Sequence, residues 1–206
     1  MPTALTRATY SVSEALLEQM LLAPSELPSD LATFERGLSG SLDNLTMAEQ
    51  GFPGNSEDTF VKLGRITGYL AEYRNPSPPS AVGSGTEVAA GTVVHLFENE
   101  DRVSHWMTNV FLKQFEANVG FVGRDGSKLM SVEELNASGF SDGAVCLHAT
   151  QRTATGLVSS TVLDFRVGRL LGVAFVASEG DLGRLDRTTK LALALERKIV
   201  SVTLSQ

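Results

Sequence analysis

The stretch from residue 161 to residue 202 places the strongest limit on what this chain can fold into. Two runs rich in β-branched and aromatic residues, 162–167 and 170–176, flank a Gly168-Arg169 pair. That pattern is typical of a β-hairpin with a two-residue turn. An apolar period of helical spacing follows over 181–202 and predicts a final helix. Because a two-stranded hairpin is not stable alone, we expect this helix to pack across it.

The same pattern occurs once more, earlier in the chain. Residues 61–68 align without gaps to residues 165–172, and both segments carry a Gly-Arg pair and a second glycine. We therefore predict an earlier hairpin over 60–73. In each hairpin a large side chain, Val61 or Phe165, would lie across the bare glycine on the facing strand.

This repeat predicts the fold class and the organisation of the chain. We expect an α+β fold in which one antiparallel sheet carries its helices mainly on one face, built from two pseudo-repeated hairpin–helix halves. The whole chain, 1–206, is predicted to be a single domain, with an N-terminal helix within 1–25, a first half over 26–118 and a second half over 144–204. Between the halves, residues 120–143 are expected to be irregular, with one helical turn near 132–135.

Composition excludes some classes of function. The formal net charge is −7, from 24 acidic and 17 basic residues, and no basic stripe stands out, so we expect no nucleic-acid partner. No apolar run approaches the roughly 18 residues that a membrane helix needs, so we expect no transmembrane segment. Cys146 is the single cysteine, so an intrachain disulfide is not available. This fits a reducing compartment but also permits the cell envelope.

No catalytic or metal-binding constellation is evident. The histidines His95, His105 and His148 show no metal-ligand spacing, so we predict no metal and no cofactor. Cys146 and His148 lie two apart on one predicted strand, and a nucleophilic pair is the alternative to a buried structural cysteine. Arg65 and Arg169, at the tips of the two predicted hairpins, are our candidate ligand-binding residues, because two guanidinium groups could flank an anion. Solvent exposure at a turn is the alternative.

Four short segments and the closing helix carry a resemblance to a known group. They are LLAPSELP at 21–28, LGRITGY at 63–69, VHLF at 94–97 and FRVGR at 165–169. In this order they resemble uncharacterised bacterial envelope proteins similar to the PsbP-like fold group, which includes small bacterial lipoproteins. The resemblance implies an antiparallel sheet with flanking helices, export, and a non-enzymatic role. It supplies no catalytic residue.

We therefore predict a non-enzymatic extracytoplasmic binding or accessory domain, from which a leader would have been removed. Its partner would be a small molecule, a lipid or a protein, held near a cleft bordered by loops 75–91 and 120–143. Two alternatives stay open: a hydrolase whose site is assembled from dispersed residues, and a homodimeric assembly protein that pairs through a sheet face or edge.

Overall fold

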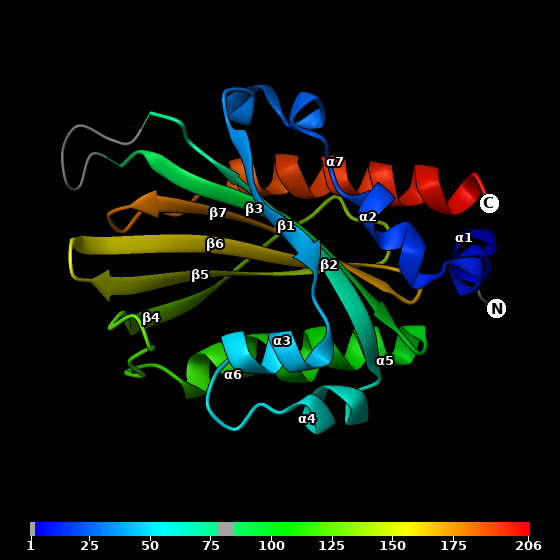
Figure 1. Ribbon diagram of the computed structural model, residues 1–206, viewed down its shortest axis with the longest axis horizontal. Helices are drawn as coiled ribbons and strands as arrows, with labels where there is room; N and C mark the ends of the chain where they lie inside the picture. The colour runs from blue at the N-terminus through cyan, green and yellow to red at the C-terminus, as the bar shows by residue number, and fades with distance from the viewer. Residues whose placement is uncertain (1–2, 78–84) are drawn as a thin grey trace.

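A seven-stranded antiparallel sheet forms the centre of the computed structural model, which describes residues 3–77 and 85–206 (Figure 1). The spatial order of the strands is β1-β2-β3-β7-β6-β5-β4. Their bounds are β1 Glu35–Ser41, β2 Arg65–Arg74, β3 Glu87–Phe97, β4 Lys128–Leu135, β5 Ala144–Thr153, β6 Gly156–Val167 and β7 Leu170–Glu179. The α+β class and the antiparallel sheet are confirmed.

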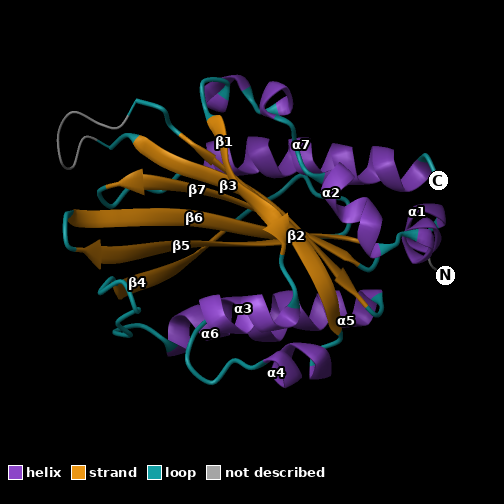
Figure 2. Ribbon diagram, in the orientation of Figure 1, coloured by secondary structure: helices purple, strands orange, loops and turns teal. Residues whose placement is uncertain are grey.

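Helices cover both faces of this sheet (Figure 2). The α-helices are α1 Ala4–Ala8, α2 Leu17–Met20, α3 Asn44–Gln50, α4 Glu57–Lys62, α5 Glu100–Trp106, α6 Leu112–Ala117 and α7 Leu185–Leu204, and a π-helical turn, Met107–Phe111, joins α5 to α6. Short 3-10 turns lie at Thr9–Ser11, Glu14–Leu16, Pro24–Glu26 and Ser29–Leu31. Helices α1, α2 and α7 lie on one side of the sheet, and α3, α4, α5 and α6 lie on the other.

The expectation of helices mainly on one face is therefore wrong. Successive residues of the central strands are apolar on both sides: on β7, Leu170 packs in the core beneath α7, whereas Leu171 packs in the core beneath α5. A strand that alternates between two apolar faces needs a cover on each. The second cover includes the helix over residues 100–117, which is capped by Asn99, whose side chain accepts the Arg102 N–H.

The C-terminal hairpin forms as predicted. Val167 pairs with Leu170 across the Gly168-Arg169 turn, and Gly168 takes the positive φ of 57° that favours glycine. Phe165 lies opposite Gly172, where a Cβ would come within 2.1 Å of its ring. Helix α7 packs across β6 and β7 and buries Leu191, Leu195 and Ile199 completely.

The predicted hairpin over 60–73 is wrong, and with it the two repeated halves. Val61 lies in α4, which begins after Ser56, whose hydroxyl accepts the Thr59 N–H. Gly64, with a φ of 81°, follows the end of that helix, and Arg65 begins β2. Strand β2 pairs with β1 on one side and, on the other, with β3, which lies beyond the 75–86 connection, so the two Gly-Arg pairs belong to unrelated elements.

Two smaller expectations also fail. The helix expected within residues 1–25 is divided into α1, α2 and 3-10 turns, and the 120–143 segment contains the edge strand β4 in place of a helical turn. The predicted loop over 75–91 is shorter, because β3 already begins at Glu87, and its residues 78–84 lie outside the described residues.

Candidate ligand-binding cleft

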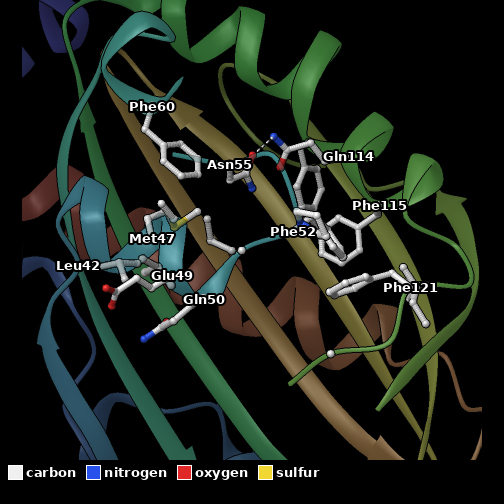
Figure 3. A pocket seen from close by; sticks show the side chains of 18 of the residues that line it. Leu42, Met47, Glu49, Gln50, Phe52, Asn55, Phe60, Gln114, Phe115 and Phe121 are labelled. Atoms are coloured by element: carbon white, nitrogen blue, oxygen red, sulfur yellow. Dashed lines mark hydrogen bonds between the residues drawn. The ribbon is translucent and has the colours of Figure 1, made fainter. Parts of the chain in front are cut away.

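A cleft of about 920 Å³ lies between the sheet and the helices of the α5 side. The strands β2, β3, β6 and β7 form its floor, helix α6 and the π-helical turn form one wall, and α3 with the loop after it forms the other. Figure 3 shows residues from these walls pointing toward one another. The lining is dominated by aromatic and aliphatic side chains, which include Phe52, Phe60, Trp106, Phe111, Phe115, Phe121, Phe175, Val93 and Val173.

The π-helical turn sets the aromatic wall. A π-helix bonds residue i to residue i+5, so Trp106 and Phe111 come to the same side, and Phe115 follows one α-helical turn later. All three line the cleft. In an uninterrupted α-helix a spacing of five residues would rotate Phe111 away from Trp106.

The loop between α3 and α4 lies against the opposite wall. The ring of Phe52 meets Phe115 edge to face with 5.0 Å between centroids, and it lies 6.2 Å from Phe121 (Figure 3). The side chain of Gln114 donates a hydrogen bond of 3.2 Å to Asn55 Oδ1. The contacts of Phe52 and Asn55 therefore hold the loop between α3 and α4 against the opposite wall of the cleft.

A buried carboxyl group lies among the residues that line the floor. Asp164 on β6 pairs with Val173 and is 1% exposed. Its Oδ2 accepts a hydrogen bond of 3.0 Å from the indole N–H of Trp106, whereas Oδ1 has no hydrogen-bond partner in the described part of the chain. Burial raises the pKa of Asp164 to about 8, against the lowering effect of the Trp106 hydrogen bond. The carboxyl group is therefore mostly protonated at neutral pH.

His95 on β3 also lines the cleft, and Arg65 fixes its tautomer. The Nε–H of Arg65 donates to His95 Nδ1 at 3.1 Å, so Nδ1 accepts and Nε2 carries the proton of the neutral ring. Burial, with a smaller contribution from Arg65, holds the pKa of His95 well below its usual range. The remaining donors of Arg65 bond Asn44 Oδ1 and the Leu42 carbonyl oxygen. Burial lowers the pKa of Arg65 to about 10, which leaves it charged.

Arg169 has a different set of internal partners. Its guanidinium donates to the backbone carbonyl oxygens of Thr9 at 3.1 Å and Val12 at 2.9 Å, and it lies over the Tyr10 ring. Arg65 and Arg169 flank the end of β3, but Arg65 contacts groups of the cleft side and Arg169 contacts the N-terminal segment. Anion binding by this pair stays a prediction. The structure gives both guanidinium groups internal partners.

The Cys146–His148 pair is not assembled for nucleophilic chemistry. Burial raises the pKa of the Cys146 thiol to about 12, with a smaller contribution from Asp164. The imidazole of His148 bonds Asp181 instead, at 2.8 Å from Nε2 to Oδ1, and Thr150 donates to the same oxygen. A thiol with a raised pKa is a poor nucleophile, so these contacts favour a structural cysteine.

Within residues 3–77 and 85–206, no group of three or more histidine, cysteine, aspartate or glutamate side chains could hold a metal ion. None of the helices there is long and apolar enough to cross a bilayer.

Asp164 and Trp106 were not identified from the sequence as site residues. One signal was available: Asp164 is an acid inside the run 162–167, which otherwise predicts a half-buried strand. A buried acid needs a partner, but nothing local indicates that this partner is an indole 58 residues away.

Comparison with known proteins supports the fold. The structure is similar to the extracellular domain of PknH from Mycobacterium tuberculosis, with a TM-score of 0.58 and 13% sequence identity over 95% of this chain and 98% of that one. The structure is more distantly similar to an uncharacterised protein from Mycobacterium smegmatis, the Rv0999 ortholog. That comparison gives a TM-score of 0.44 and 11% sequence identity over 82% of this chain and 90% of that one. No protein-family model and no curated protein sequence matches the chain. At this identity, the likeness to the PknH domain establishes a shared fold.

Proposed function

We propose that this chain is a non-enzymatic extracytoplasmic domain that binds an apolar small molecule, or the apolar part of a lipid, in the cleft. The observation that carries the proposal is the cleft itself. Its volume of about 920 Å³ lies in the range of small-molecule sites, and its lining combines aromatic and aliphatic side chains with polar groups at defined positions. A π-helical turn at a cleft wall is also a feature that recurs at functional sites.

The extracytoplasmic part of the proposal has separate support. The fold is shared with a domain described as extracellular. The sequence resemblance to the PsbP-like group of envelope proteins also supports a location outside the cytoplasm. The proposal includes membership of that group and attachment to the membrane as a lipoprotein. A domain of this kind would present its cleft to molecules outside the cytoplasm.

A fluorescence titration with N-phenyl-1-naphthylamine tests the binding function. This neutral probe brightens on entering an apolar site, and we expect saturable binding to the folded protein. Val173→Phe, which adds a ring to the cleft floor, should weaken binding by about tenfold or more, equivalent to roughly 1.4 kcal/mol. Val61→Phe, on the exposed surface of α4, is the matched control and should leave binding unchanged.

Circular dichroism establishes that both variants fold, and Val93→Phe serves as a second cleft variant should Val173→Phe fail to fold. Absence of saturable binding, or equal loss in the cleft variants and the control, contradicts the proposal.

A further inference from the structure

The chemistry around Asp164 narrows the class of ligand. We propose that the molecule bound in the cleft is an apolar amine, whose ammonium group pairs with the free oxygen of Asp164 beside the ring of Trp106. This inference rests on the proposed binding function and adds the identity of the polar group that the ligand carries.

One oxygen of the Asp164 carboxyl group lacks a hydrogen-bond partner within residues 3–77 and 85–206. Buried polar atoms in folded proteins nearly always have a partner. Asp164 Oδ1 has none in the described part of the chain, although the residue is only 1% exposed and lines the cleft. The other oxygen is held by the Trp106 N–H, so the carboxyl group has a fixed orientation. A donor on the ligand would supply the missing hydrogen bond.

The charged side chains around the cleft are mostly acidic. Glu49, Glu72 and Asp125 line it together with one guanidinium, that of Arg124, whereas Asp164 is mostly protonated in the free protein and adds little negative charge. The neutral His95 adds no charge, because burial keeps its pKa low. The formal net charge of the whole chain is also negative, −7. These charges disfavour a carboxylate or phosphate ligand and favour a cationic one.

The surroundings of the carboxyl group are mostly aromatic. Trp106 meets it with its N–H edge, and the ring centroid of Trp106 lies 6.1 Å from that of Phe60 and 6.1 Å from that of Phe97. Charges attract each other more strongly in such apolar surroundings than in water, and a hydrogen bond between two charged groups is stronger than one to a neutral donor. An ammonium group therefore suits this carboxylate better than a hydroxyl group.

The protons balance in this pairing. Asp164 is mostly protonated in the free protein at neutral pH, because burial raises its pKa to about 8. An alkyl amine is an ammonium ion at neutral pH, so its binding displaces the proton of the carboxyl group into the solvent and leaves a carboxylate paired with the ammonium group. No other reactant is needed.

Three probes of equal chain length test the proposal: dodecylamine, dodecanol and dodecanoate, below their aggregation concentrations. Trp106 is the single tryptophan of the chain, so its intrinsic fluorescence reports events at the site. Displacement of N-phenyl-1-naphthylamine provides a second readout. We expect wild-type protein to bind dodecylamine about tenfold more tightly than dodecanol, with dodecanoate the weakest.

Asp164→Asn keeps an oxygen that can accept the Trp106 hydrogen bond but removes the acid. It should lower the affinity for dodecylamine about tenfold and leave that for dodecanol unchanged. Asp186→Asn, in the first turn of α7 on the other side of the sheet, makes the same replacement of an acid by an amide outside the cleft and should affect none of the three probes.

The outcomes separate the two proposals. Equal affinity for dodecylamine and dodecanol, or equal effects of Asp164→Asn and Asp186→Asn, overturns the amine assignment while leaving the binding function intact. Failure of all three probes to bind overturns the binding function as well. Should Asp164→Asn not fold, the comparison of the three probes on wild-type protein still decides the question.

Discussion

Replacement of Asp164 by asparagine should change how the stability of this protein depends on pH. The pKa of the acid is 3.8 in its ordinary state and about 8 in the folded protein, because burial penalises the charged form. Between these values the folded state holds a proton that the unfolded state has released. Stability is then lost as pH rises through this window, and the loss is complete above the folded pKa.

The magnitude follows from the width of the window. Each pH unit inside it costs up to about 1.4 kcal/mol, so the roughly four units between the two pKa values set an upper limit near 6 kcal/mol. This is a large share of the roughly 5–15 kcal/mol that stabilises a typical domain. Asparagine has the shape of the acid, can accept the Trp106 hydrogen bond and does not ionise. The variant should therefore escape this loss.

Chemical denaturation followed by circular dichroism measures the difference, since fluorescence of the nearby Trp106 would itself respond to the substitution. We expect the two proteins to differ little at about pH 4, and the variant to be more stable by at least about 2 kcal/mol at about pH 9. Other groups titrate equally in both proteins and cancel in the comparison. A stability difference that stays constant from acid to alkaline pH would show that Asp164 is ionised in the folded state, and the reasoning about its burial would fail.

Three further predictions concern the fold and the site. Gly172→Ala places a Cβ against the ring of Phe165 and should lower the free energy of unfolding by about 1–3 kcal/mol. Gly40→Ala, on an edge strand, places its Cβ where no other atom lies within 4 Å and should lower it little. Equal denaturation midpoints for the two variants would contradict this. Leu195→Ala should lower the free energy of unfolding by about 2–5 kcal/mol, because this side chain of α7 is fully buried against the sheet. Arg197→Ala, on the exposed side of the same helix, should lower it by under about 0.5 kcal/mol, and similar losses would show that α7 is peripheral. The ring of His95 should stay neutral across the physiological range, because burial lowers its pKa, and an NMR titration step above about pH 6 would contradict the buried arginine contact.

Elements specified by short-range interactions could be predicted from the sequence alone. The β6–β7 hairpin depends on its two apolar runs and on a glycine that takes the positive φ of the turn. The helix after Asn99 depends on a side chain that caps its first turn, and α7 depends on an apolar period of its own. Each of these signals lies within a few residues of the structure that it specifies.

Other features depended on what lies nearby in space. The pair Gly64-Arg65 has the local pattern of Gly168-Arg169, but the residues before it form helix α4, whose Phe60 is buried beside Trp106 of a distant helix, and the first hairpin does not form. Strand β4 has few apolar residues facing a core and is stabilised mainly by hydrogen bonds to β5, so its own residues give a weak signal.

The candidate site depends most clearly on contacts that only the folded structure makes. Asp164 lies on a strand and Trp106 on a helix, and no residue pattern in either segment indicates that the two side chains meet. Only the packing of α5 against the sheet brings Trp106 to Asp164 and closes the carboxyl group off from water. The burial that raises the pKa of the acid, and that gives the cleft its chemistry, is contributed by many distant residues together, so no local pattern encodes it.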